Sequence, residues 1–515
     1  MGERHLTKKT IRSISMILLA ALISGCSGYS KQMSDSITSA RMGNLPQALS
    51  SLESNNTGSD KDLLYFMEKG ELLRMSGRHD DGRTAWLEAD AKVRSWEDDA
   101  RNDPEKLMGE IGSFLVNDTT RRYDGRDYEK VLLSVRLAQT HLALGDWDSA
   151  RTEIKKMHER EAIIAEFRAK EIEKAQETSK EKGIRTSSFR QINGYPIETL
   201  DDPAVRALKN SYESAYANYL AGFLYEALGE GSLAAPGYRK AAEMCPGQPV
   251  LETSLAELDG HIAHHGIPGK TDTLFVIETG LAPTIQSITL PILLPIPQKN
   301  GFNILATPIS WPVVRADPTT PRLTSLTVDG QTLPVVPLSD VNAMARRALS
   351  DEMPSIIARS AVRAITRGAA QAAMDTTASN TGGNAALVLT VVSLVTKVAS
   401  VATEVADERI WRTLPATFSV ARVALPAGPH QITLATPFGP VTRDITVAGR
   451  YSVIGLRMLD QSLYVTQPAQ VPKELAPLEG VAKPAESVQP APTVAPTSPP
   501  APVKKRRGRA AKASH

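Results

Sequence analysis

The chain has 515 residues, a formal net charge of +2 and hydrophobic residues at 42% of its positions. That length predicts roughly two to four domains of ~100–200 residues each, with enough apolar residues to build real cores. A charge so close to neutral argues against a polyanion as partner of the whole chain, although the last dozen residues are strongly basic. Aromatic residues make up 5% of the chain, while Ala, Leu and Val are common, which favours helix.

The first 25 residues predict an export signal. His5, Lys8, Lys9 and Arg12 form a basic start, and the apolar run 14–23 follows. Ten apolar residues span about 15 Å as a helix, which is half of a ~30 Å hydrocarbon core, so a membrane-spanning helix is not expected here.

The sequence around Cys26 resembles the lipobox of bacterial lipoproteins. Ile23 is aliphatic, and Ser24 and Gly25 are small. The resemblance implies cleavage between Gly25 and Cys26, followed by acylation of the Cys26 thiol and of the new N-terminus. Each buried CH₂ contributes ~0.8 kcal/mol, so three acyl chains would anchor the protein permanently. Because Ser27 and not Asp follows the cysteine, the resemblance implies the outer membrane, facing the periplasm. An ordinary secretory signal is the alternative.

Four stretches share one spacing: a glycine, a small residue five positions on and a bulky residue nine positions on. They are 43–52, 77–86, 145–154 and 229–238. Two antiparallel helices joined by a tight turn need glycine where the chain reverses and small residues where the helices touch. The spacing resembles the tetratricopeptide repeat, with its best copy at 218–246, and predicts a helical array with insertions. The residues predicted to pack the repeats are Gly70, Gly77, Gly82, Trp86, Gly145, Trp147, Ala150, Gly222, Tyr225, Gly229, Ala234, Tyr238, Ala241 and Pro246.

The stretch 155–182 consists of good helix formers with alternating charge, so we expect a long exposed helix that extends the third copy. A coiled-coil partner for this helix is the alternative. Glycine and proline near 266–270 then end the helical pattern, and 273–278 predicts a buried strand.

Two helical segments, 338–374 and 385–411, interrupt short apolar runs rich in proline and β-branched residues. We expect a buried hairpin helix in the uncharged run 385–396 rather than a membrane insertion. Strands separated by proline or glycine turns resume after Pro415 and resemble a small β-sandwich. Proline is frequent from 468 to 502, so no core can form there.

The predicted fold class is multidomain α+β. After the signal at 1–25, a tetratricopeptide-like helical array covers 26–266. A β-rich, sandwich-like domain covers 270–462 and carries a helical insertion at about 338–411. A disordered, Pro-rich basic tail covers 465–515.

Two motifs suggest a ligand, and both have a simpler explanation. Gly229, Gly231 and Ala234 satisfy the G-x-G-x-x-A dinucleotide fingerprint, but that fingerprint needs a preceding strand and a helical pattern precedes it here. His261 and His265 lie one helical turn apart, a spacing that can chelate a metal, yet histidines also suit the end of a helix. We therefore expect neither a metal nor a cofactor.

Clustered positive charge raises the question of an anionic partner. Arg359, Arg363 and Arg367 form a stripe on one helix face, which is either such a contact or a solvated face. In a tail beyond the membrane, an anionic envelope polymer or phospholipid surface is a more plausible target than nucleic acid. A merely solubilising tail is the alternative. The tail residues of this candidate contact are Lys504, Lys505, Arg506, Arg507, Arg509 and Lys512.

No catalytic pattern stands out, so we do not expect an enzyme. The sequence has no G-x-S-x-G elbow and no histidine that anchors a triad. Cys245 precedes Pro246 at a helix end and is most simply a small packing residue.

The order of these features is similar to that of a family of uncharacterised proteobacterial lipoproteins with tetratricopeptide-like N-terminal halves. The family brings no established activity. We expect an outer-membrane-anchored protein-interaction scaffold that uses its tetratricopeptide-like repeats in envelope assembly or maintenance, with unknown protein partners. The alternative is an envelope enzyme or ligand carrier with a pocket between the helical and β regions. The stretches that carry the resemblance are the lipobox, 123–133, 219–230, 280–283, 411–415 and 425–428.

Overall fold

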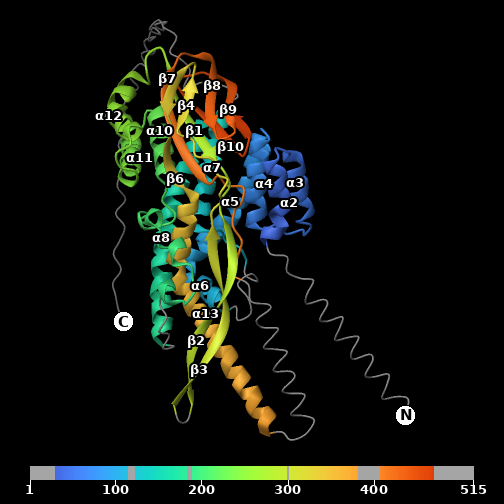
Figure 1. Ribbon diagram of the computed structural model, residues 1–515. Helices are drawn as coiled ribbons and strands as arrows, with labels where there is room; N and C mark the ends of the chain where they lie inside the picture. Colours follow the sequence, from blue (N-terminus) through green and yellow to red (C-terminus); the bar gives the residue numbers. More distant parts are fainter. Residues whose placement is uncertain (1–28, 114–121, 182–187, 299–300, 381–405, 469–515) are drawn as a thin grey trace, which may run out of the picture. The chain divides into compact units, whose positions relative to one another are not determined.

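The computed structural model describes residues 29–113, 122–181, 188–298, 301–380 and 406–468 (Figure 1). A helical region from α2 to α12 comes first, and a strand-rich region with mixed sheets follows it. This order agrees with the two-part α+β architecture predicted from the sequence. All described residues belong to one unit of the chain, residues 1–477.

Eight of the helices form consecutive hairpins. These pairs are α2 (Tyr29–Arg41) with α3 (Leu45–Ser54), α4 (Leu63–Met75) with α5 (His79–Asn102), α7 (Asp127–Ala143) with α8 (Trp147–Glu181), and α10 (Ala215–Ala227) with α11 (Gly231–Met244). The remaining elements of the helical region are α6 (Pro104–Ser113), η2 (Phe189–Gln191), η3 (Ile197–Thr199), α9 (Pro203–Arg206) and α12 (Pro249–His264).

A glycine in the left-handed conformation turns the chain in each hairpin. Gly43, Gly77, Gly145 and Gly229 have φ angles of 77°, 73°, 77° and 78°. Side chains other than glycine's are strained at such angles, which explains why the sequence repeats a glycine at this point.

Small and large residues fit together between the helices of two hairpins. A Cβ atom added at Gly70 would lie 2.3 Å from Nε1 of Trp86, and one added at Gly222 would lie 2.6 Å from Cδ1 of Tyr238. Gly70 and Gly222 each precede their turn glycine by seven residues, and the aromatic residues follow it by nine. The repeated spacing therefore records contacts between the two helices of a hairpin.

The strands form three sheets. Five strands lie in the order β11–β10–β1–β7–β6, four in the order β5–β4–β8–β9, and β2 pairs with β3 alone. In the first sheet β1 is parallel to β10 and antiparallel to β7. The strands are β1 (Thr271–Thr279), β2 (Thr284–Gln298), β3 (Gly301–Arg315), β4 (Ser325–Val328), β5 (Gln331–Pro334), β6 (Val336–Asp340), β7 (Thr417–Leu425), β8 (Gly428–Thr436), β9 (Gly439–Val447), β10 (Tyr451–Leu459) and β11 (Ser462–Thr466).

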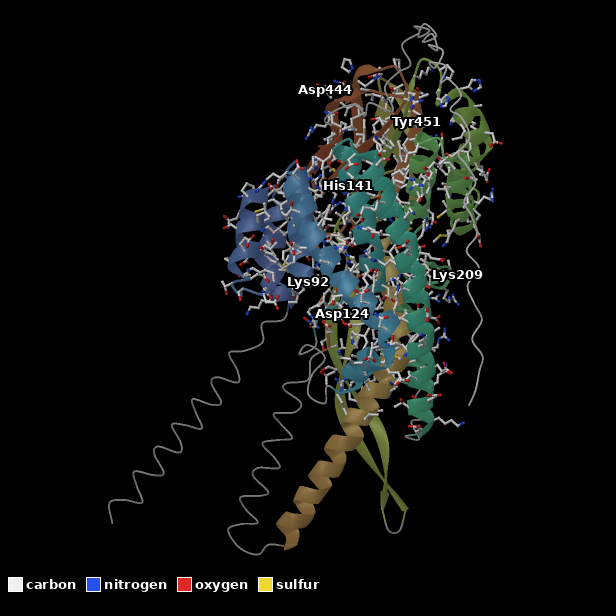
Figure 2. All side chains as sticks on the ribbon, turned by 180° about the vertical axis from the view of Figure 1, so that it is seen from behind. Lys92, Asp124, His141, Lys209, Asp444 and Tyr451 are labelled. Atoms are coloured by element: carbon white, nitrogen blue, oxygen red, sulfur yellow. The ribbon has the colours of Figure 1, made fainter. Side chains whose placement is uncertain are left out.

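The five-stranded sheet is covered on both faces. All nine residues of β1 are buried, in agreement with the buried strand predicted at 273–278. Leu274 and Val276 join the apolar core of the helices, while Phe275 and Ile277 join a core shared with the four-stranded sheet. Tyr451 of β10, labelled in Figure 2, packs edge-on against Phe223 of α10 with ring centroids 5.6 Å apart.

The helical insertion differs from the prediction. One helix, α13 (Val341–Asn380), covers its first part and contacts α8, β2 and β3. Residues 406–411 are not helical, so the predicted end of the second segment is wrong, while its earlier part, 385–405, lies outside the described residues. No helix among the described residues is both long and apolar enough to cross a membrane.

The β2–β3 hairpin is longer than the short strands expected from the sequence. Its fifteen residue pairs run without a break from Thr284–Arg315 to Gln298–Gly301. Every proline belongs to the same alternate set of pairs, in which the backbone nitrogen points away from the partner strand. Proline has no N–H to offer, so this placement leaves the ladder between the strands intact. The prolines are Pro291, Pro295, Pro297, Pro308 and Pro312.

Candidate functional site

The first helices of the later hairpins are buried on all sides. All 17 residues of α7 and all 13 residues of α10 are buried. A helix on a protein surface buries only one stripe, so these helices must be covered on two sides. The partner helices α8 and α11 cover one side, and strands β6, β7 and β10 contact the other. The inner face of the hairpin array is thus occupied by the chain's own β region.

Buried ion pairs connect this inner face to strand β1. Arg136 of α7 is fully buried, donates to Glu71 of α4 at 3.0 Å and also pairs with Glu278 of β1. Arg74 of α4 donates to the second oxygen of Glu278 at 3.1 Å. Burial would raise the pKa of Glu278, but Arg136 and Arg74 lower it to about 2. Glu278 is therefore ionised and is held by cations from two hairpins.

Two further buried carboxylates hold the segment that leads into β7. Glu129 of α7 accepts the backbone N–H of Trp411 at 2.7 Å, and Glu68 of α4 accepts those of Arg412 and Thr413 at 2.6 and 2.9 Å. Burial raises the pKa of both carboxyl groups. These bonds hold the backbone of residues 411–413 against α7 and α4.

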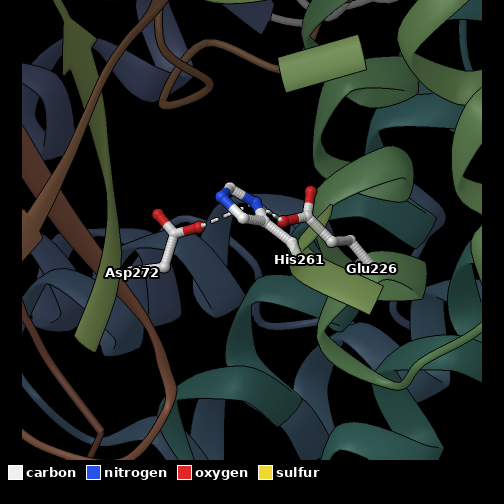
Figure 3. Close-up of side chains that lie close together, drawn as sticks. All are labelled: Glu226, His261 and Asp272. Atoms are coloured by element: carbon white, nitrogen blue, oxygen red, sulfur yellow. Dashed lines mark hydrogen bonds and ion pairs between the residues drawn. The ribbon is translucent and has the colours of Figure 1, made fainter. Parts of the chain in front are cut away.

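A third buried cluster joins α10 and α12 to the sheet (Figure 3). His261 of α12 lies with Nδ1 2.7 Å from Oε1 of Glu226 and 3.9 Å from Oδ2 of Asp272. One oxygen or nitrogen from each of these residues could hold a metal ion together. However, the guanidinium of Arg422 already lies 2.6 Å from Glu226 and 2.5 Å from Asp272. The arrangement is thus a salt-bridge cluster, in which the guanidinium of Arg422 occupies the position that a metal ion would take between the carboxylates.

The predicted histidine pair is not brought together with this cluster. His265 lies after the end of α12 in the left-handed conformation, with φ at 53°, and is exposed. The hydrogen bond to Glu226 raises the pKa of His261 despite partial burial. His261 therefore contacts Glu226 across the junction of α12 and α10.

A small polar cavity of about 80 Å³ lies beside Lys130 of α7. The Lys130 Nζ lies 3.6 Å from the ring centre of Trp96 and 3.3 Å from Oδ1 of Asp127. Burial lowers the pKa of Lys130. Arg168, also at this cavity, pairs with Asp127 at 2.6 Å. Lys130 and Arg168 at this cavity are thus paired with Asp127, and the cavity has room for little more than water.

A larger cavity of about 480 Å³ lies between the helical and β regions. Its lining comes from α9 and the loop after it, the start of α10, the end of α11, the end of β1, the segment 321–324, strands β6 and β7 and the start of α13. Cys245, expected to be a packing residue, is half-buried in this lining, and its thiol lies 3.5 Å from the carbonyl oxygen of Leu338. Burial raises the pKa of Cys245, so its thiol stays protonated near neutral pH.

The structure places the predicted repeat residues at helix turns and helix–helix contacts. A Cβ atom added at Gly82 would lie 3.1 Å from the carbonyl oxygen of Gly70. Trp147 begins α8, and Pro246 follows α11 and is exposed. The residues buried between helices are Trp86, Ala150, Tyr225, Ala234, Tyr238 and Ala241. Gly231 starts α11 directly after a helix, so no strand precedes the dinucleotide-like motif.

The charged stretches have partners where they are described. The end of α8, expected to be an exposed helix, contacts α13, and Arg359 lies 3.8 Å from Glu171. Arg363 is buried and donates to Ser360. The side chain of Arg367 is not among those that the structure describes, and Gly25, Cys26 and the six basic residues of the tail lie outside the described residues.

The buried charges are not among the residues predicted from the sequence. Glu278 directly follows the apolar run 274–277 of β1, and Arg422 stands between Ala421 and Val423 in β7. This placement is the signal that could have indicated them. A charge inside a buried strand requires a partner, because an unpaired buried charge is too costly.

No family model matches the chain, and no curated protein matches it. Among solved structures, a crystal structure of a tetratricopeptide repeat protein from Parabacteroides merdae ATCC 43184 is matched with 14% sequence identity and a TM-score of 0.13. The match covers 45% of this chain and 98% of that chain. With so low a TM-score, the likeness supports no conclusion about function.

Proposed function

We propose that this chain is a lipid-anchored protein of the bacterial outer membrane, facing the periplasm, that acts as a protein-interaction scaffold in envelope assembly or maintenance. Its support is the lipobox-like sequence at Cys26, the tetratricopeptide-like spacing and the resemblance to a proteobacterial lipoprotein family. The structural support is that the chain's own strands cover the inner face of the hairpins, which leaves the outer helices for partner proteins.

Open repeat arrays commonly bind partners along their concave surface. In this chain the corresponding face holds strand β1 through Arg136 and Glu278, and the segment before β7 through Glu68. Partners would therefore meet the outer helices α5, α8 and α11, while the inner helices fix the β region in place. The scaffold would thus present a helical surface and a β-sheet surface, held together by the buried ion pairs.

Photo-crosslinking in cells tests this proposal on the intact chain. A photoreactive phenylalanine analogue would replace one of three exposed apolar residues on the outer helices: Leu87, Ile172 or Leu233. Phe438, exposed at the turn between β8 and β9, is the matched position in the β region. We expect mass spectrometry to identify the same protein partner from at least two of the helix positions. Partners found only from Phe438 would contradict a scaffold based on the hairpins.

The anchor has a separate test. Cys26→Ala should abolish fatty-acid labelling and leave the precursor uncleaved. Membrane fractionation that stays unchanged in this variant would contradict anchoring through Cys26.

The 480 Å³ cavity favours a second function, that of a ligand carrier. It lies between the helical and β regions, which is the location expected for the pocket of this alternative. No histidine lines the cavity among the described residues, and its two acidic residues are Glu213 and Asp340. The lining thus gives more support to binding than to catalysis.

A further inference from the structure

The cavity beside Cys245 has the dimensions of a small-molecule site. Its volume of about 480 Å³ falls within the ~300–1,000 Å³ of ligand pockets in proteins. Leu208 and Met244 line it from the helical region, and Leu338 and Met344 line it from β6 and α13. Leu338 and Met344 are buried, whereas Leu208 and Met244 are only half-buried. The lining thus includes apolar surface that is still open to contact.

Several polar side chains in the walls already have hydrogen-bond partners. The hydroxyl oxygens of Thr279 and Thr417 lie 2.6 Å apart, and those of Ser339 and Ser214 lie 2.8 Å apart. The Cys245 thiol donates to a backbone carbonyl of β6 at 3.5 Å. Because these groups already have partners, they favour an apolar body over a polar one inside the cavity.

Among the described residues, the charges around the cavity leave the guanidinium of Arg322 without a partner. Glu213 pairs with Lys240 at 2.9 Å. Asp340 accepts two backbone N–H groups from the first turn of α13. Arg322 is exposed at the cavity, and within the described part of the chain no ion pair or hydrogen bond engages its guanidinium. A free guanidinium beside an apolar space is suited to a ligand with an anionic end, because it can donate two parallel hydrogen bonds to a carboxylate or phosphate.

We propose that this cavity binds an amphipathic anion, with the apolar body between Met244 and Met344 and a carboxylate or phosphate head on Arg322. The inference rests on the carrier alternative and does not depend on the scaffold. Two sources share this chemistry: a free fatty acid with a carboxylate head, and a lysophospholipid with a phosphate head.

The test uses the chain from residue 26 to 515 with Cys26→Ser, which removes the anchor and leaves Cys245 as the one thiol. The rate at which a maleimide modifies Cys245 would be measured against increasing oleate, lysophosphatidic acid or uncharged oleyl alcohol. We expect saturable protection by at least one of the two anions, at lower concentrations than by the alcohol. Tighter binding of oleate assigns a fatty acid, and tighter binding of lysophosphatidic acid assigns a lysophospholipid.

Three variants decide whether the cavity is responsible. Arg322→Glu should weaken anion binding by about tenfold, the loss expected for one charge-assisted contact, and leave the alcohol unaffected. Arg443→Glu makes the same change of charge at an exposed position of β9, and it should alter neither the binding of the anions nor that of the alcohol. Leu208→Trp should fill the cavity and abolish protection.

Thermal unfolding followed by circular dichroism would establish that each variant is folded. Absence of protection in the parent chain, or equal effects of Arg322→Glu and Arg443→Glu, would overturn the proposal. So would undiminished binding by folded Leu208→Trp. Photo-crosslinked partners that persist in Arg322→Glu would leave the scaffold standing whatever the outcome for the ligand.

Discussion

The five-stranded sheet meets the helices through one face and the four-stranded sheet through the other, and the two interfaces differ in composition. On β1, Asp272 and Glu278 enter ion pairs at the helix-facing side, whereas Phe275 and Ile277 enter an entirely apolar core on the opposite side. Apolar burial is non-directional, but buried charges tolerate few arrangements. The helix-facing interface therefore specifies how the β region docks, and the other supplies general stability.

Arg136→Met should produce the largest effect. It removes a fully buried cation and leaves Glu71 and Glu278 without their main partner. We expect the free energy of unfolding to fall by about 3–5 kcal/mol, the usual consequence of breaking a buried pair from one side. Urea titration followed by circular dichroism measures the loss. A cost below that of Phe275→Leu would contradict the difference between the interfaces.

Phe275→Leu makes the matched change on the other face of β1. It keeps an apolar side chain of similar size in the core shared by the two sheets. We expect a loss below about 1.5 kcal/mol, because conservative apolar exchanges are tolerated. The same urea titration applies, and the tertiary packing of the tryptophans, read from the near-ultraviolet circular dichroism of the whole chain, should stay unchanged.

Glu68→Gln should alter how stability depends on pH. The folded-state pKa of Glu68 is raised above its ordinary value of 4.5, so its contribution is fully present below pH 4.5 and is lost as pH rises through the folded-state value. The amide cannot ionise, so the variant should lack this loss. Unfolding midpoints measured from pH 4 to pH 7 should decline less steeply than those of the parent chain. Identical slopes of unfolding midpoint against pH for the variant and the parent chain would show that folding does not change the pKa of Glu68.

His261→Asn should have the smallest effect, at the partly exposed edge of the same interface. Hydrogen bonding to Glu226 raises the folded-state pKa of His261 above 6.5, so its stabilisation is present below pH 6.5 and is lost as pH rises through the raised value. We expect a difference of less than about 1 kcal/mol from the parent chain at pH 6, vanishing by pH 9. Thermal unfolding at the two pH values measures it.

The sequence predicts the features of this fold that depend on local patterns. The turn glycines and the strand at 273–278 follow from conformational preference and from a continuous apolar run. The contact between Arg136 and Glu278 joins residues 142 positions apart, and no local pattern states which buried charges will meet. The same applies to the cavity, since Cys245 meets a β6 carbonyl 93 residues away. Residues 406–411 have a helical pattern, but carboxylates from distant helices bind the backbone that follows.

The hairpin of β2 and β3 also affects the chain before it has folded. Long uncharged segments with alternating β-branched residues are prone to intermolecular stacking while they are unfolded. The prolines that point their nitrogens outward remove donors from both free edges of this hairpin. A second molecule consequently finds an interrupted template, so these prolines would hinder polymerisation of the chain through the β2–β3 hairpin.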